Sequence, residues 1–248
     1  MDRADLILSQ PERGYRYSLD PFLLADFCRP RRNDLILDLG TGVGVIGLLL
    51  ARRHLSVRVV GVELQPGLAR RAAHNAQVNA LSGRCLFIRG DVREAPRFLP
   101  PERFNRVVAN PPFRSPGSGA IPADHGRACA RQELTFTIGD LARTASALLR
   151  CGGSLDMIHL AERLPEICRA LDAFGLEPKR LRLVAPFSGS APRLCLVSAT
   201  KGARPGLRVL PQLVLHEGRE RRDVDEGGAR RVGNPDRPRG DEKRQPDR

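Results

Sequence analysis

Short apolar runs alternate with longer amphipathic segments from residue 34 to residue 200. Runs such as "DLILDLG" (34–40) are near-continuously apolar, which is typical of strands that are buried on both faces of a sheet. The longer segments between them are typical of helices that present one apolar face. We therefore expect strands at 34–40, 57–63, 84–91, 104–110, 153–160, 179–186 and 193–200, and helices at 45–54, 66–81, 131–150 and 161–175.

This alternation predicts an α/β fold with a mostly parallel, seven-stranded sheet and helices on both of its faces. No helix separates the last two strands, so we expect them to pair antiparallel. Pro66 suits the first turn of the second helix, and Gly152 and Gly153 are candidates to end the third.

Three stretches lack this periodicity and suggest the domain boundaries. Residues 1–32 form a mixed lead-in that we expect to pack on a single α/β domain, residues 33–216. Residues 114–128 form a loop rich in Gly and Pro, long enough to be functional. Residues 217–248 mix charges with Gly and Pro and nearly lack large apolar groups, which predicts a disordered charged tail.

The glycine-rich stretch "LDLGTGVGVIG" follows the first predicted strand and opens a helix. Glycines let the backbone turn tightly and approach a ligand, and the helix N-terminus adds free N–H groups. Glu63 ends the second strand about 20 residues on, where an acid that binds a ribose belongs. The pattern indicates a cofactor that bears a nucleoside, either NAD or S-adenosylmethionine, because Gly42, Gly44 and Gly47 also fit G-x-G-x-x-G.

Three further features choose between these cofactors. Asp38 precedes the glycines, Asp91 ends the third strand, and "NPPF" (110–113) ends the fourth. Strand ends of an open α/β sheet face one crevice, so these residues should meet there. The combination resembles the class I S-adenosylmethionine-dependent methyltransferases, with "NPPF" as the motif of the branch that methylates amino groups. The resemblance implies a Rossmann-like fold.

Longer segments resemble the bacterial tRNA1(Val) adenine-37 N6-methyltransferase family. They are "GYRYSLDPFLLADF" before the glycines, "ARQELTFTIGDLARTASALLRCGGSL" after NPPF, and "PRLCLVSATKGARPGLRVLPQLVLHEG" near the end. The resemblance extends to about residue 217, although residues between Phe113 and Ala130 match less well and the tail does not match. It implies transfer of a methyl group from S-adenosylmethionine to the N6 amine of an adenine in RNA, at position 37 of a tRNA anticodon loop.

The chemistry of an adenine amine explains why such a motif is needed. The lone pair on this nitrogen is delocalised into the ring, so two acceptors that hold its N–H bonds make it a better nucleophile. The Asn110 side chain and the Pro111 carbonyl can serve as these acceptors, while Pro112 stiffens the turn and Phe113 can stack on the base. We expect the cofactor to contact Asp38, Gly40, Thr41, Gly42, Gly44, Glu63, Leu64, Asp91, Val92 and Asn110.

The net charge of +13 bears on the partner. Residues 216–248 hold 10 Lys or Arg and 9 Asp or Glu, whereas residues 1–215 hold 31 and 19. The basic excess therefore lies in the predicted domain, which favours a nucleic acid, here tRNA. Arginine-rich codon usage is the alternative, since only three of the 41 basic residues are lysines. Candidate substrate contacts are Arg16, Tyr17, Ser18, Arg114, Arg127 and Arg131.

Cysteine and histidine usage gives no sign of a metal site. The cysteines are scattered without a Cys-x-x-Cys pair, and the histidines lack metal-ligand spacing. We therefore expect buried, inert thiols at Cys28, Cys85, Cys129, Cys151, Cys168 and Cys195, and assign nothing to His54, His74, His125, His159 and His216. An N-terminus that contains Asp2, Asp5 and Glu12 and no apolar block of signal-peptide length predicts a cytoplasmic protein that does not enter a membrane, and we expect a monomer.

Two other functions remain open. A protein glutamine N5-methyltransferase also clamps a planar amide with NPP and an aromatic residue. A protein that binds the cofactor without turnover could retain the same fold, although an intact NPPF motif counts against it.

Overall fold

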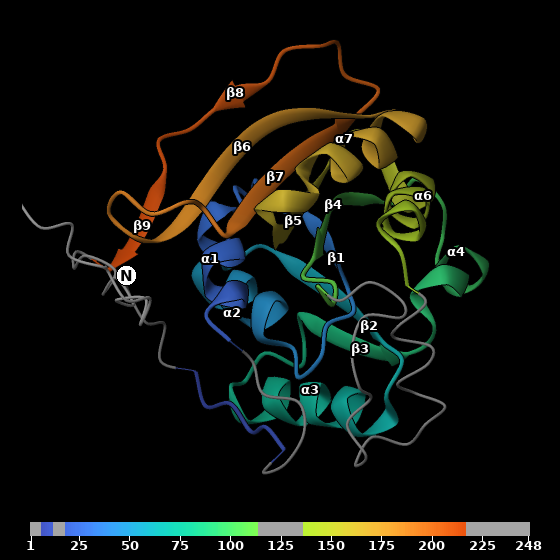
Figure 1. Ribbon diagram of the computed structural model, residues 1–248. Coiled ribbons are helices and arrows are strands. Elements are labelled where there is room, and N and C mark those ends of the chain that lie inside the picture. The colour runs from blue at the N-terminus through green and yellow to red at the C-terminus, as the bar shows by residue number, and fades with distance from the viewer. Residues whose placement is uncertain (1–5, 12–17, 114–135, 217–248) are drawn as a thin grey trace, which may run out of the picture.

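The computed structural model describes residues 6–11, 18–113 and 136–216. Its centre is a twisted sheet in the order β3-β2-β1-β4-β5-β7-β6-β8, with β9 also paired to β6 (Figure 1). The strands are β1 Leu35–Leu39, β2 Arg58–Glu63, β3 Cys85–Arg89, β4 Phe104–Ala109, β5 Leu149–Leu160, β6 Leu176–Phe187, β7 Leu194–Lys201, β8 Arg208–Val209 and β9 Leu213–His216.

The first five strands pair in parallel, so their carboxyl ends reach the same edge of the sheet. β7 runs antiparallel between β5 and β6. The register places Leu39 of β1 beside Val62 of β2 and Ala109 of β4. The residues that follow these three strands therefore enter the same space, which becomes the site described below.

Helices cover both faces of the sheet, because successive residues of each strand point to opposite sides. Ile36 packs in the same apolar cluster as α1 and α2, whereas Leu37 packs with α6 and α7. The helices are α1 Asp20–Phe27, α2 Val45–Arg53, α3 Pro66–Val78, α4 Ala95–Phe98, α6 Ile138–Leu148 and α7 Leu164–Ala173, with 3-10 turns η1 Val92–Glu94 and η2 Ala161–Arg163.

Asn75 of α3 and Asn79, which caps the C-terminal end of that helix, hold the described part of the N-terminal lead-in. The Asn75 amide accepts from the Ser9 N–H at 2.8 Å and donates to the Ser9 carbonyl at 3.0 Å. Asn79, one helical turn on, exchanges the same pair of bonds with Ile7. Ile7 and Ser9 are two residues apart in an extended segment, and Asn75 and Asn79 are four residues apart along the helix. Both pairs are separated by about 6–7 Å along the chain axis, so the two sets of bonds can form together.

A buried charge cluster holds α1 against the sheet. Arg106 of β4 pairs with Asp156 of β5, which is fully buried, and donates to the Arg29 carbonyl at 2.8 Å. Arg180 of β6 donates to the Phe27 carbonyl at 3.2 Å and lies 4.5 Å over the Phe27 ring. The C-terminal end of α1 is therefore fixed by cations that come from two strands.

The prediction of a mostly parallel α/β sheet with an antiparallel last strand is confirmed, with two differences. The described residues form nine strands rather than seven, because β8 and β9 add short parallel pairings to β6 that are too brief to give an alternating pattern. The expected helix 131–150 was wrong at its C-terminal end. It ends at Leu148, and Gly152 and Gly153 lie inside β5.

The prediction of buried cysteines was wrong in part. Cys151 stands near the start of β5 in a short exposed stretch with Arg150 and Gly152, before the buried part of the strand. Among the cysteines of the described residues, Cys28, Cys85 and Cys195 are buried, Cys168 is half-buried and Cys151 is exposed.

Candidate functional site

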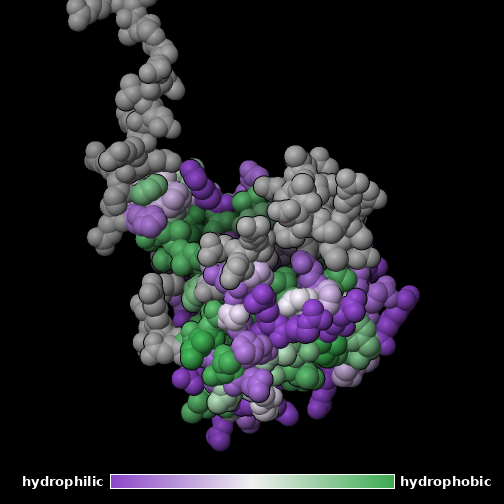
Figure 2. Space-filling model, turned by 90° about the horizontal axis from the view of Figure 1, so that it is seen from below, coloured by the Kyte–Doolittle hydropathy of each residue, from purple (hydrophilic) through white to green (hydrophobic). Residues whose placement is uncertain are grey.

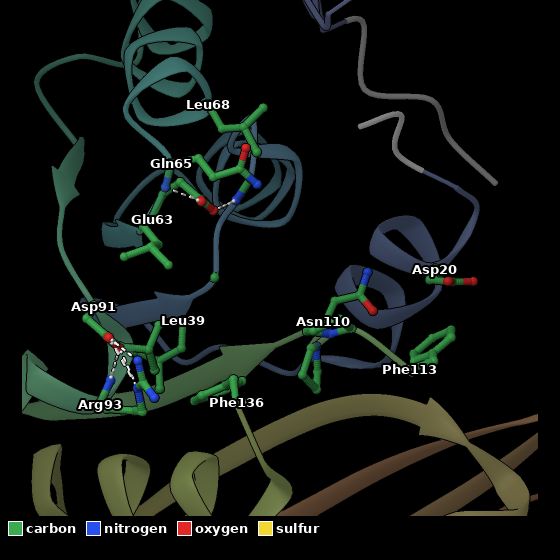
Figure 3. Close-up of a pocket in the computed structure, with 16 residues that line it drawn as sticks. Asp20, Leu39, Glu63, Gln65, Leu68, Asp91, Arg93, Asn110, Phe113 and Phe136 are labelled. Carbon is green, nitrogen blue, oxygen red and sulfur yellow. Dashed lines mark hydrogen bonds and ion pairs between the residues drawn. The ribbon is translucent and has the colours of Figure 1, made fainter. Parts of the chain in front are cut away.

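A cavity of about 290 Å³ opens at the carboxyl ends of the parallel strands (Figure 3). Residues from the ends of β1, β2, β3 and β4 meet there, together with residues of α1 and α3 and one residue that precedes α6. Its lining comprises Asp20, Leu39, Gly40, Gly42, Glu63, Leu64, Gln65, Leu68, Asp91, Val92, Arg93, Asn110, Pro111, Pro112, Phe113 and Phe136.

The glycine turn that follows β1 is tied to the neighbouring strand. The N–H groups of Gly40 and Thr41 donate to the Val62 carbonyl at 2.9 and 3.1 Å. Gly44 has a φ of 88°, and a Cβ there would lie 3.0 Å from the Phe87 ring. A side chain at this position is therefore excluded by both backbone strain and space. At Gly40, which lines the cavity, an added Cβ would meet nothing within 4 Å.

Glu63 ends β2 and is held by backbone donors at both carboxylate oxygens. Oε2 accepts from the Gly42 N–H at 2.9 Å, and Oε1 accepts from the Gln65 N–H at 2.8 Å (Figure 3). The residue is only 6% exposed. Its position is thus fixed before a ligand arrives, and a carboxylate can accept further bonds at its other lone pairs.

Asp38 lies behind the glycine turn rather than in the cavity lining. It is fully buried, and Oδ2 accepts from the Thr41 hydroxyl at 2.6 Å. Oδ1 is buried without a hydrogen-bond partner among the described residues. Burial raises the pKa of Asp38 to about 7, although bonds from Thr41 and Gly47 oppose this shift. The side chain therefore organises the turn and does not face the ligand space.

Asp91, which follows β3, forms an ion pair with Arg93 inside the cavity. Oδ1 accepts from the Arg93 backbone N–H at 2.9 Å, and Oδ2 accepts from Nη2 at 2.6 Å. Nε of the same arginine lies 3.1 Å from both oxygens. The hydrogen bond from the Arg93 side chain is the main cause of the lowered pKa of Asp91. An adenine amine at this end would share the carboxylate with Arg93.

Asn110 to Phe113 form the other end of the cavity, directly after β4. Asn110 and Phe113 are half-buried, Pro111 is buried, and Pro112 is exposed. Asp20, at the start of α1, lies on the same side of the cavity as Asn110 and Phe113, away from Glu63 and Asp91 (Figure 3). Glu63 and Asp91 therefore lie at one end of the cavity, and Asp20 with the NPPF residues lies at the other (Figure 3).

The Phe113 ring contacts His159, which lies near the end of β5. The ring centroids are 5.2 Å apart, and the planes are tilted by 52°. His159 is only 1% exposed, and burial, followed by nearby Arg163, lowers its pKa to about 4. The imidazole is therefore uncharged at neutral pH.

The structure brings most of the predicted site residues to one cavity. Gly40, Gly42, Glu63, Leu64, Asp91, Val92 and Asn110–Phe113 line it, while Asp38, Thr41 and Gly44 lie outside its lining. Arg16, Tyr17, Arg114, Arg127, Arg131, the loop 114–128 and the tail 217–248 lie outside the described residues, whereas Ser18 is described and exposed.

Sequence reasoning missed the lining residues Asp20, Leu39, Gln65, Leu68, Arg93 and Phe136, as well as His159 behind Phe113. Gln65 and Arg93 could have been found, because each stands two residues after an acid that ends a strand. Asp20 and Phe136 lie inside the longer segments that resemble the methyltransferase family, but no local signal marks either one as a cavity residue, and His159 lies outside those segments.

Two kinds of feature are absent from the described part of the chain. It has no cluster of three or more His, Cys, Asp or Glu side chains that could hold a metal ion. It also has no helix that is both long enough and apolar enough to cross a membrane.

Comparison with known proteins relates the chain to methyltransferases. A family model described as the methyltransferase small domain matches residues 21–165. The tRNA1(Val) (adenine(37)-N6)-methyltransferase of Porphyromonas gingivalis is 33% identical over 162 residues, which cover 64% of this chain and 63% of that protein. The enzyme of that name from Actinobacillus pleuropneumoniae is 31% identical over 183 residues, 67% of this chain and 74% of that protein. The chain thus spans 63% of the length of the curated relative named first.

Solved structures support the same fold. A predicted O-methyltransferase from Agrobacterium tumefaciens superposes with a TM-score of 0.67 at 27% identity, covering 82% of this chain and 90% of that chain. TrmN from Thermus thermophilus superposes with a TM-score of 0.55 at 27% identity, covering 73% of this chain and 48% of that chain. The Rossmann-like methyltransferase fold predicted from the sequence is confirmed by these likenesses.

Proposed function

The chain belongs to the methyltransferase small domain family and to the family of the tRNA1(Val) (adenine(37)-N6)-methyltransferases that it matches, and from this premise we propose that it is an S-adenosylmethionine-dependent N-methyltransferase. Its acceptor is the exocyclic N6 amine of an adenine in RNA, at position 37 of a tRNA. The observation that carries this proposal is a single cavity lined by both the glycine turn with Glu63 and the NPPF residues.

The end of the cavity that is lined by Gly40, Glu63 and Asp91, here called the cofactor end, fits a charged nucleoside. Open space beside Gly40 lets a ligand approach the backbone, and buried Glu63 offers carboxylate oxygens to the ribose hydroxyls. Asp91 and the buried Val92 stand at the next strand end, where the adenine ring would lie. When bound, S-adenosylmethionine supplies an electrophilic methyl group on its sulfonium.

The end of the cavity that is lined by the NPPF residues, here called the acceptor end, fits a planar amine. The Asn110 side-chain oxygen and the Pro111 carbonyl accept the two N–H bonds of the amine and turn its lone pair towards the methyl group. Held in this way, the nitrogen would attack the methyl carbon that the cofactor supplies, the C–S electron pair would stay on sulfur, and the surplus N–H proton would pass to water. Positioning supplies the acceleration, so a titrating base is not required. Buried Asp38, although its pKa is about 7, lies outside the cavity lining.

An RNA acceptor is supported by the names of the relatives and by the charge of the domain. Phosphate contacts can come from Arg89, which is exposed and ends β3 at the carboxyl edge of the sheet, where the cavity opens. Figure 2 shows the underside of the molecule, where hydrophilic residues lie among hydrophobic ones. A base in an anticodon loop is already partly unstacked, so moving it into the cavity costs less than extracting it from a duplex.

The test is methyl transfer from labelled S-adenosylmethionine to total unmodified bacterial tRNA, followed by digestion to nucleosides. We expect labelled N6-methyladenosine, and a tRNA carrying another base at position 37 should not be labelled. Label in a release-factor protein instead of RNA would assign the clamp to a glutamine amide. Cofactor binding without label in RNA or protein would indicate a binding protein.

A further inference from the structure

Phe113 is supported from outside the cavity by a buried imidazole. Phe113 lines the cavity and is half-buried, whereas His159 does not line it and is 1% exposed. The 5.2 Å separation and 52° tilt of the two rings describe a tilted aromatic contact. Such contacts fix the mutual orientation of two rings.

The imidazole itself is fixed by the backbone of β5. Its Nδ1 accepts from the Leu160 N–H at 2.8 Å, so the neutral ring carries its proton on Nε2. The register pairs His159 and Leu160 with Cys195 and Leu194 of β7, which places this part of β5 inside the sheet. Phe113 follows the end of β4 and therefore rests on a ring that is anchored in a neighbouring strand.

We propose that His159 is a positioning residue that sets the plane of the Phe113 ring for stacking on the acceptor base. This inference rests on the proposed function, because it concerns the same cavity and a planar acceptor. His159 acts through Phe113 and does not touch the cofactor end, which is formed by Glu63 and Asp91. We therefore expect substitution of His159 to lower kcat/KM for tRNA and to leave the Kd for S-adenosylmethionine unchanged.

The orientation of the Phe113 ring matters because the acceptor base would stack on it. One base on one aromatic ring is worth about 1–3 kcal/mol, which corresponds to about 5- to 150-fold in binding or rate. The stacked ring also fixes the angle at which the amine meets Asn110. A ring that rotates would lose both the stacking and the in-line approach to the methyl group.

Two substitutions separate the ring contact from the hydrogen bond. His159→Phe keeps an aromatic ring against Phe113 but loses the acceptor for the Leu160 N–H. His159→Asn places an oxygen near the position of Nδ1 but removes the ring. We measure kcat/KM for unmodified tRNA, the Kd for S-adenosylmethionine by calorimetry, and thermal unfolding of each full-length variant.

If His159 positions Phe113, kcat/KM for tRNA falls about tenfold or more in His159→Asn and about threefold or less in His159→Phe, while the cofactor Kd stays unchanged in both. The opposite order, with His159→Asn active and His159→Phe impaired, would overturn the proposal in favour of a structural hydrogen bond. In a Phe113→Leu background, His159→Asn should cause little further loss, and an additive loss would also overturn the proposal.

The chain offers a matched control in the pair Phe187–His216, whose ring centroids are 5.5 Å apart and whose planes are tilted by 36°. Neither residue lines the cavity. His216→Ala should leave kcat/KM unchanged, and a loss equal to that of His159→Asn would show that the effect is not specific to the cavity, which overturns the proposal.

One measurement requires no variant at His159. In the wild-type chain with labelled Phe and His rings, the nuclear Overhauser contact between Phe113 and His159 should persist when an unmodified anticodon stem-loop binds. Loss of the contact on binding would overturn the positioning role. The wild-type assay separates the failure of the two proposals. A wild-type chain that binds the cofactor but methylates no RNA contradicts the proposed function. An active wild type, together with a His159→Phe variant that is as impaired as His159→Asn, contradicts the role of His159.

Discussion

The two ends of the cavity are built in different ways. At the cofactor end, Glu63 and Asp91 are fixed by hydrogen bonds from residues within the same short turns or the neighbouring one. At the other end, the Phe113 ring contacts the ring of His159, which lies 46 positions later in the sequence. A fixed cofactor needs fixed polar partners, whereas a planar acceptor needs an oriented apolar surface.

The comparison predicts that variants at the two ends affect different kinetic constants. Cofactor-end variants should change the affinity for S-adenosylmethionine, and acceptor-end variants should change the rate of transfer. Two experiments test this division directly, beginning with the larger expected effect, and two more test the contacts and the titrating groups behind the cavity.

Asn110→Ala should have the largest effect. Loss of the side-chain oxygen leaves one N–H bond of the amine unheld, and we expect kcat to fall about 100- to 1000-fold, as when one preorganised transition-state partner is removed elsewhere. The Kd for S-adenosylmethionine should change little. Single-turnover transfer to tRNA and calorimetry measure the two quantities. Asn33→Gly, at an exposed turn residue with a φ of 64°, is the control. Normal turnover by Asn110→Ala would refute the clamp.

Glu63→Gln should mainly weaken cofactor binding. The new NH₂ group would face a backbone N–H from Gly42 or Gln65, so one charge-assisted bond is lost and a donor is left unpaired. We expect the affinity for S-adenosylmethionine to fall about 10- to 100-fold, with kcat at saturation retained. Glu102→Gln, an exposed residue paired with Lys201, controls for the loss of one charge. A fall in kcat at unchanged Kd would contradict the division.

Asn75→Ala should lower the stability of the fold, because Asn75 connects the lead-in to the glycine turn. Besides its bonds to Ser9, the Asn75 amide donates to the Val43 carbonyl at 2.9 Å. We expect the free energy of unfolding to fall by about 1–3 kcal/mol and amide exchange to rise at both residues 6–11 and residues 41–44. Asn79→Ala, which contacts Ile7 but not the turn, should raise exchange only at 6–11. Equal exchange at 41–44 in both variants would refute the link.

The fourth prediction concerns the pH dependence of stability, where Asp38 and His159 have opposite signs. The folded chain raises the pKa of Asp38 from an ordinary 3.8 to about 7, so the contribution of this residue to stability falls as pH rises between about 4 and 7. It lowers the pKa of His159 from an ordinary 6.5 to about 4, so the contribution of this residue rises with pH between about 4 and 6.5. Each slope is at most about 1.4 kcal/mol per pH unit.

Denaturant unfolding of wild type and of one variant at each residue, measured across this pH range, tests the sign of each residue's contribution to stability. The stability of Asp38→Asn relative to wild type should increase as pH rises, because the variant lacks the carboxyl that must ionise. The stability of His159→Phe relative to wild type should decrease as pH rises. Parallel curves for a variant and wild type would show that the residue does not titrate differently in the folded chain.

The sequence by itself determined the α/β class, the positions of the first seven strands along the chain and the glycine turn with Glu63 and NPPF. These features are local: apolar runs, helical spacing and residues at strand ends report directly on nearby backbone geometry. The parallel arrangement of the strands then brings their carboxyl ends together, so the main site residues could be grouped from the sequence alone.

Only the tertiary structure decided which side chains complete and support the site. Asp20, Phe136 and His159 reach it through packing between elements distant in the chain, and β8 and β9 are strands because β6 offers them an edge. Asp38 lies behind the turn because the register pairs it with Gly61, two residues before Glu63, and its carboxylate accepts from the Thr41 hydroxyl of the turn above it. Such placements depend on contacts between distant residues, which no local pattern in this sequence encodes.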